Sequence, residues 1–84
     1  MSITKGDIRQ AIVAAIGASG GAEGMEFDSG RTLREYGVSS LSVYQFASAI
    51  EAALHLEIPD EDFRPEHFAT LGDIERLIAR IVRD

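Results

Sequence analysis

Few residues in this chain have side chains suited to catalysis or metal binding. The 84-residue sequence contains two histidines, His55 and His67, and no cysteine. Without cysteine, the chain has no disulfide, thiolate metal ligand or cysteine nucleophile. Neither histidine has a second histidine at the spacing of a zinc site, and no serine, histidine and aspartate form a specific triad pattern. We therefore predict that the protein is not an enzyme and has neither catalytic residues nor a bound metal.

Two further patterns suggest ligand sites but lack essential residues. Asp60-Glu61-Asp62 resembles the start of a calcium loop, but an EF-hand needs glycine at its sixth position, where this sequence has Pro65. Residues 18–24 contain three glycines. They lack both the Gly-Lys-Ser/Thr ending of a phosphate-binding loop and a preceding strand. We interpret the first segment as a solvated acidic surface and the second as a flexible loop.

The most informative segment is Gly37-Val38-Ser39-Ser40-Leu41, where a loop meets a helix. A hydroxyl at such a junction is exposed and faces the positive end of the helix dipole. A phosphate ester formed there would be stabilised by the dipole and by free backbone N–H groups. Alternatively, Ser39 caps the helix and Ser40 merely begins it, since serine is common at helix starts. Local spacing leaves both interpretations open.

Helical periodicity dominates the rest of the chain, and no segment has the alternation of a strand. We predict helices over residues 4–17 and 40–56, and a last helix that begins after Thr70, with the second about 25 Å long and the longest. Residues 60–64 are expected to form one short turn, because Pro65 interrupts it. Apolar residues are expected to attach the long first connection and the late loop to the core; they are Met25, Phe27, Leu33, Tyr36 and Phe68.

Composition narrows the class of protein further. The net charge is −6, and residues 57–75 carry seven acidic residues against one arginine. This is the wrong sign for binding a nucleic-acid backbone. No apolar run approaches the roughly 20 residues of a membrane span, and the N-terminus lacks signal-peptide features. We expect one domain over residues 1–84, monomeric and cytoplasmic.

Three motifs, in order, resemble the acyl and peptidyl carrier proteins. They are Leu33 to Leu41 before an amphipathic helix, Ile58-Pro59-Asp60-Glu61-Asp62, and Phe68-Ala69-Thr70-Leu71-Gly72-Asp73-Ile74. The resemblance spans roughly residues 3–83. It implies an all-α four-helix bundle with a long first loop and a short third helix. It also implies a carrier that itself does no chemistry.

The resemblance assigns the attachment of 4′-phosphopantetheine to Ser40, because the following Leu41 fixes the register. The cofactor's thiol would hold an acyl or aminoacyl group as a thioester. Implied partners are a phosphopantetheinyl transferase, an activating ligase and a downstream synthase or transferase. Ser39 replaces the aspartate that the family usually has before the modified serine, which predicts weaker recognition by standard transferases.

The exposed face of the second helix differs from that of typical fatty-acid carriers, where it is acidic. Ser42, Gln45 and Ser48 make it small and nearly neutral, so electrostatic steering would be weak. With Ser39 and Leu41, these residues are the predicted partner contacts. This pattern is similar to that of specialised carriers, including stand-alone aminoacyl carriers; drift in an ordinary carrier is the alternative.

The acidic segment offers a second docking surface through Glu61 and Asp62, or simply a solvated rim that keeps the protein soluble. A different class of function is an unmodified helical interaction module that binds a basic protein through residues 57–66. A regulatory subunit of an enzyme complex is a third.

Overall fold

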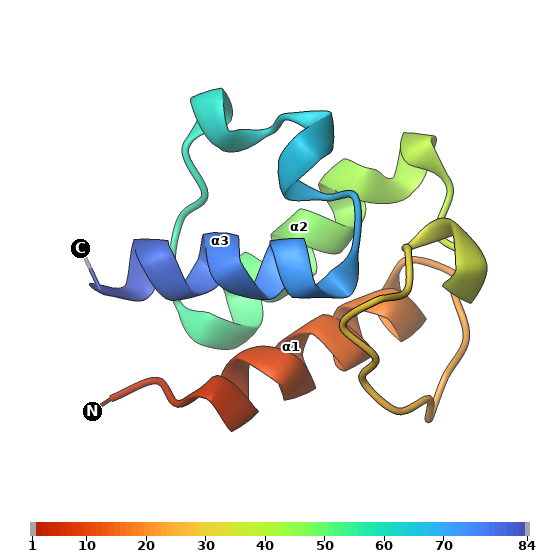
Figure 1. Ribbon diagram of the computed structural model, residues 1–84, viewed down its shortest axis with the longest axis horizontal. Coiled ribbons are helices and arrows are strands. Elements are labelled where there is room, and N and C mark those ends of the chain that lie inside the picture. The colour runs from red at the N-terminus through yellow and green to blue at the C-terminus, as the bar shows by residue number, and fades with distance from the viewer. Residues whose placement is uncertain (1, 84) are drawn as a thin grey trace.

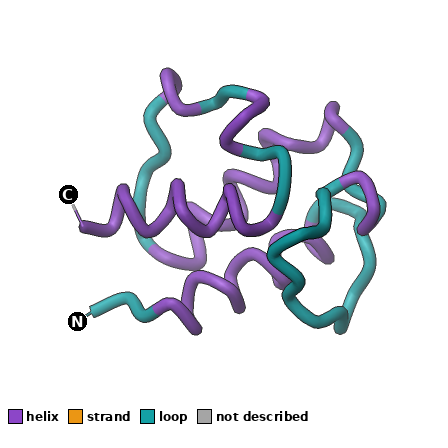
Figure 2. The backbone as a smooth tube through the Cα atoms, viewed as in Figure 1, coloured by secondary structure: helices purple, strands orange, loops and turns teal. Residues whose placement is uncertain are grey.

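In the computed structural model, which describes residues 2–83, the fold contains three α-helices joined by irregular segments (Figure 1). They are α1 (Lys5–Ala18), α2 (Val43–Leu54) and α3 (Leu71–Arg83). Figure 2 shows that the connections are loops interrupted by short helical turns. These 3-10 turns are η1 (Arg34–Tyr36), η2 (Ser40–Ser42), η3 (Asp60–Asp62) and η4 (Pro65–His67). The all-α class is confirmed, with three α-helices among the described residues instead of the four expected.

Side-chain hydrogen bonds cap both ends of α1. Thr4 accepts from the Asp7 backbone N–H at 3.1 Å, and Asp7 accepts in return from the Thr4 N–H at 2.9 Å. This capping box satisfies two of the N–H groups that a helix start leaves without partners. At the other end, the Ser19 hydroxyl donates to the Ala15 carbonyl at 2.7 Å. The predicted helix over residues 4–17 is confirmed to within one residue at each end.

A similar box starts α3. Thr70 Oγ1 accepts from the Asp73 N–H at 3.1 Å, and the Thr70 N–H donates to Asp73 Oδ2 at 3.2 Å. Hydrogen bonds from Thr70, supported by the nearby Arg76 guanidinium, lower the pKa of Asp73. The carboxylate therefore stays ionised at the positive end of the helix dipole, and the predicted cap is confirmed.

The second helix is shorter than predicted. It has 12 residues against 14 in α1, about 18 Å of axis, so the expectation that it is the longest was wrong. Residues 40–42 form a separate 3-10 turn before it, and the helix ends at His55 in the left-handed conformation, with φ 55°. After α2, Pro59 precedes η3, which is the short turn predicted over residues 60–64. Pro65 begins the second turn, η4, which was not predicted.

The core lies where the three helices meet, and the loop segments contribute to it. It is made of the buried residues Ile8, Ile12, Ala15, Ile16, Leu33, Val38, Phe46, Ala47, Ile50, Ile58, Leu71, Ile74, Leu77 and Ile78. Met25, Phe27, Tyr36 and Phe68 are partly buried against them, as expected for anchors of long connections. An ion pair of 2.5 Å from Arg9 to Glu75 ties α1 to α3, and the Arg9 guanidinium also lies 4.7 Å from the Phe27 ring centroid.

The start of α1 and the end of α3 lie at the same end of the bundle, and the loop that leads to Ser40 lies at the opposite end (Figure 1). None of the helices formed by residues 2–83 has the length and apolarity needed to cross a bilayer. Within the same residues, no three histidine, aspartate or glutamate side chains meet as a metal site would require.

His55 provides a test of the end of α2. Its φ of 55° is the left-handed conformation that costs an L-residue free energy but suits glycine. We expect His55→Gly to raise the free energy of unfolding by roughly 0.5–1 kcal/mol, measured by urea denaturation. His55→Ala keeps the Cβ atom and should bring no such gain. A loss of stability in the glycine variant would contradict this account.

Candidate functional site

Ser40 lies where the first loop ends and the turn η2 begins. Ser39 is extended, with φ −79° and ψ 163°, and its carbonyl accepts from the Ser42 N–H at 3.0 Å. The Ser40 carbonyl accepts from the Val43 N–H, which joins the turn to α2. Ser40 is exposed, and its hydroxyl makes no hydrogen bond to any of residues 2–83. The backbone of this serine is therefore fixed while its side-chain oxygen stays free.

Ser39 does not cap the helix with its side chain, contrary to the second of the two local interpretations. Its hydroxyl lies 3.3 Å from the Ser42 hydroxyl, and no side-chain cap bond forms at the start of η2 or of α2. The inserted 3-10 turn explains this, because backbone carbonyls already accept from the N–H groups that a capping oxygen would reach.

Buried residues before the site hold Ser40 at the surface. Val38 is only 2% exposed, and its N–H donates to the Leu33 carbonyl at 3.0 Å. Gly37 ends η1 with φ 87°, a conformation that glycine adopts without strain. The Ala22 N–H donates to the Tyr36 carbonyl at 2.8 Å. The first half of the loop thus contacts residues 36–38 and holds in place the segment that leads to Ser40.

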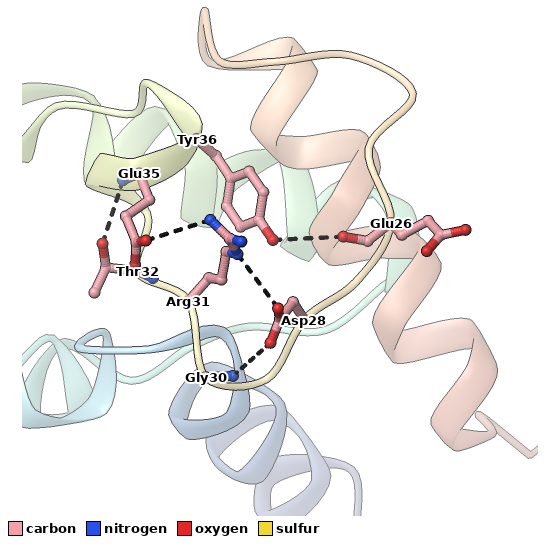
Figure 3. Close-up of polar contacts among 7 residues, drawn as sticks. All are labelled: Glu26, Asp28, Gly30, Arg31, Thr32, Glu35 and Tyr36. Carbon is pink, nitrogen blue, oxygen red and sulfur yellow. Dashed lines mark hydrogen bonds and ion pairs between the residues drawn. The ribbon is translucent and has the colours of Figure 1, made fainter.

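Charged and polar side chains stiffen the same loop (Figure 3). Arg31 reaches Asp28 at 3.3 Å and Glu35 at 3.5 Å, and Thr32 and Glu35 exchange hydrogen bonds across the start of η1. Partial burial, with help from the Asp28 charge and against that of Arg31, raises the pKa of Tyr36. Its phenol therefore stays neutral and donates to the Glu26 carbonyl at 3.5 Å.

Two large apolar side chains next to Ser40 are exposed. Leu41 is 94% exposed and Tyr44 is 68% exposed. The Tyr44 ring stacks on Phe63 from a distant segment, with 4.9 Å between the ring centroids. Phe63 stacks in turn on Phe68 at 5.7 Å. Periodicity along one helix could not reveal a partner that lies nineteen residues further along the chain.

The predicted partner contacts fall on two neighbouring surfaces. Ser39, Leu41, Gln45 and Ser48 are exposed and Ser42 is partly exposed along the start of α2, where no residue from 39 to 50 is charged. Glu61 and Asp62 belong to η3, which the Tyr44–Phe63 stack brings beside α2. Asp62 is ion-paired with Arg80 at 2.7 Å, so of these two acids only Glu61 is a free exposed carboxylate.

Ser40 also opens onto a cavity of about 760 Å³. Three segments line it, namely the end of the first loop, the start of α2 and the η4 region. The lining residues are Thr32, Leu33, Arg34, Gly37, Val38, Ser39, Ser40, Val43, Pro65, Phe68 and Ala69. Arg34 and Pro65 were not predicted as site residues, because the sequence pattern does not show that the segments containing them lie together beside Ser40.

The sequence matches the family described as phosphopantetheine attachment site over residues 7–78. The chain belongs to this family. Its members carry covalently attached 4′-phosphopantetheine, and the chain is therefore a carrier protein, as the motif resemblance implied. Comparison with curated proteins finds no match.

Two solved structures share the fold. One is a chain from the crystal structure of Bradyrhizobium japonicum glycine:[carrier protein] ligase complexed with glycylated carrier protein. It has a TM-score of 0.63 and 19% identity, covering 87% of this chain and 95% of that one. The other comes from the same ligase complexed with its cognate carrier protein and an analogue of glycyl adenylate, with a TM-score of 0.66, 18% identity, and coverage of 90% and 95%.

The residues around Ser40 suit a covalently attached, phosphate-linked arm. Its hydroxyl is exposed and unbonded, the residue before Ser39 is buried, and the adjoining cavity is open enough for a flexible chain to lie against. No carboxylate lines this cavity to repel the phosphate. The carrier would thus present the arm from a rigid base, with its free end in solvent.

Gly21 tests how the loop supports this site. A Cβ atom on Gly21 would lie 2.7 Å from both the Tyr36 carbonyl oxygen and an Ile16 methyl group. We expect Gly21→Ala to lower the free energy of unfolding by about 1–3 kcal/mol and to shift the amide resonances of residues 36–40. Gly30→Ala is the control, since its Cβ would meet only Asp28 Oδ1 at 3.7 Å. Equal stability of the two variants would refute the close approach.

Proposed function

We propose that Ser40 is the residue that carries 4′-phosphopantetheine, and that the protein delivers an acyl or aminoacyl thioester on this arm to enzymes of a specialised biosynthetic pathway. The observation that supports Ser40 most directly is its free, exposed hydroxyl between the buried Val38 and the buried Phe46. Family membership supplies the cofactor, and the exposed Leu41 after Ser40 agrees with the register of the family motif.

In the attachment of phosphopantetheine, the chain supplies the Ser40 hydroxyl oxygen at a fixed position on its surface. The Ser40 oxygen forms a bond to the phosphorus of coenzyme A that bears pantetheine. Adenosine 3′,5′-bisphosphate leaves with the bridging oxygen, and the hydroxyl proton is released. The thiol that then holds the cargo belongs to the arm, which is consistent with a chain that has no cysteine. Once loaded, the carrier supplies position and recognition and no catalytic group.

We propose an activating ligase as one partner and an amino acid as the favoured class of cargo. The support comes from the two related folds, in which carrier proteins are complexed with a glycine ligase. The uncharged start of α2 agrees with a dedicated partner, because contact there depends on shape and hydrogen bonding more than on steering by charge. Ser39, Leu41, Ser42, Gln45 and Ser48 form this proposed docking face.

The acidic η3 turn is the weaker candidate for docking. Its Asp62 is already neutralised by Arg80, which leaves Glu61 as the η3 member of the predicted contacts that can meet a basic partner. A partner on the α2 face would still reach Glu61 across the Tyr44–Phe63 stack. We therefore assign Glu61 to the edge of the docking face, and Asp62 to holding η3 against α3.

Loading assays identify the modified serine. When the protein is incubated with coenzyme A and a broad-specificity phosphopantetheinyl transferase, intact mass should increase by one phosphopantetheinyl group. Ser40→Ala should abolish this increase. Ser39→Ala should retain it, because the neighbouring hydroxyl lies in the turn but is not the acceptor.

The same assay distinguishes the alternatives. Loss of labelling in Ser39→Ala alone would move the site by one residue. Absence of labelling in the natural sequence would favour an unmodified interaction module that acts through residues 57–66, and would contradict the proposed function.

Leu41 tests the docking face. Because its side chain is 94% exposed, Leu41→Ala should leave the urea midpoint unchanged. If the side chain is buried against the transferase, its loss should remove about 1–2 kcal/mol of binding to the transition state, and kcat/KM for loading should fall roughly 5- to 30-fold. Leu41→Met keeps the apolar contact and should restore most of the rate. Unchanged kinetics in the alanine variant would exclude Leu41 from the interface.

A further inference from the structure

Arg34 lies in the lining of the cavity beside Ser40, and its side chain has no hydrogen-bond or ion-pair partner among residues 2–83. It is the first residue of η1, it is exposed, and it lines the same cavity as Ser39 and Ser40. Of the eleven residues that line this cavity, Arg34 alone is charged. Any charged group that enters the cavity from outside therefore meets one cation and no carboxylate.

Most of the other arginines are paired with a carboxylate, unlike Arg34. Five of the seven have a carboxylate within 4 Å: Arg9 with Glu75, Arg31 with Asp28 and Glu35, Arg64 with Glu66, Arg76 with Asp73, and Arg80 with Asp62. Among residues 2–83, Arg34 and Arg83 have none. Arg31, only three residues earlier, is held by two carboxylates (Figure 3), whereas Arg34 keeps its charge available.

The backbone at Arg34 is fixed even though its side chain is free. Leu33 before it is 5% exposed, and the Arg34 carbonyl accepts from the Gly37 N–H at 3.0 Å. The adjacent Glu35 is tied to Thr32 through the Thr32 N–H at 2.9 Å. Arg34 is thus fixed by its backbone in the lining of the cavity, and guanidinium groups bind phosphate oxygens through charge-assisted hydrogen bonds.

We propose that Arg34 is the counter-ion of the phosphodiester at Ser40, and that this contact directs the arm into the cavity toward Pro65 and Phe68. The inference rests on the proposed attachment at Ser40. It makes Arg34 a positioning residue, because it acts on the orientation of the arm and forms no bond to cargo. Since both groups are near the surface, salt should weaken the contact as the Debye length falls.

Phosphorus NMR of the loaded protein tests the contact directly. Intact mass first establishes loading of the natural sequence, Arg34→Gln, Arg34→Lys and the control Arg83→Gln, which removes the same charge from the far end of α3. Spectra are then recorded between about 0.01 M and 1 M salt, where the Debye length falls from about 30 to about 3 Å.

In the natural protein and in Arg83→Gln, the phosphodiester resonance should move with salt toward its high-salt position. In Arg34→Gln it should already be near that position at low salt, and Arg34→Lys should recover part of the salt dependence. Resonances that are identical in the natural protein and Arg34→Gln would overturn this inference while leaving Ser40 loading intact. Failure of the natural protein to load would overturn both.

Discussion

The burial of Val38 and Phe46 on either side of the η2 turn is the constraint on which the site depends. Val38 is 2% exposed and Phe46 fully buried, so the chain is fixed to the core eight residues apart. Between these two positions Ser39, Ser40 and Leu41 are exposed, and Ser42 is partly exposed. The burial of Val38 and Phe46 stabilises the folded chain. It also holds the segment between them, which contains Ser40, at the surface.

The first loop extends this constraint to the rest of the bundle. The carbonyls of Ser29 and Arg31 accept from the first N–H groups of α3, at 2.9 Å from Gly72 and 2.8 Å from Leu71. Further along, the same loop contacts Gly21 and enters the core at Leu33. The first loop thus connects the end of α1 and the start of α3 to the turn that contains Ser40. Its residues are positioned by contacts between distant parts of the chain as well as by local propensity.

The sequence predicts well those features that are decided within one turn of helix. The capping boxes at Thr4 and Thr70 each join residues three apart, and the predicted starts of the first and last helices at these positions were confirmed. The start of α2 was not predictable in this way, because serines suit a helix start and a 3-10 turn equally. The short turn predicted over residues 60–64 was confirmed as η3, whereas the second turn, η4, was not predicted, because two prolines restrict a segment without specifying how many turns it forms.

The parts of the site that escaped prediction depend on contacts between segments that are distant in the sequence. Nothing in the residues near Tyr44 shows that Phe63 will stack on it. Likewise, the seven arginines are the same residue type, and only the fold determines which of them pair with carboxylates among residues 2–83. The local motif could indicate Ser40, but its electrostatic surroundings are a property of the packed chain.

The distribution of charge on the folded surface differs between the two sides of Ser40. The α2 side is uncharged from residue 39 to residue 50 and carries the exposed Leu41, which suits contact with a protein surface. Among residues 2–83, the lining on the cavity side contains one arginine without a carboxylate partner, and apolar walls from Val43, Pro65 and Phe68, which suits a phosphate followed by a flexible chain. An aspartate at position 39 would place a negative charge between these two sides and beside Arg34. Serine at this position therefore leaves the Arg34 charge unopposed within the cavity, and the departure from the usual family motif is consistent with the local electrostatics of this fold.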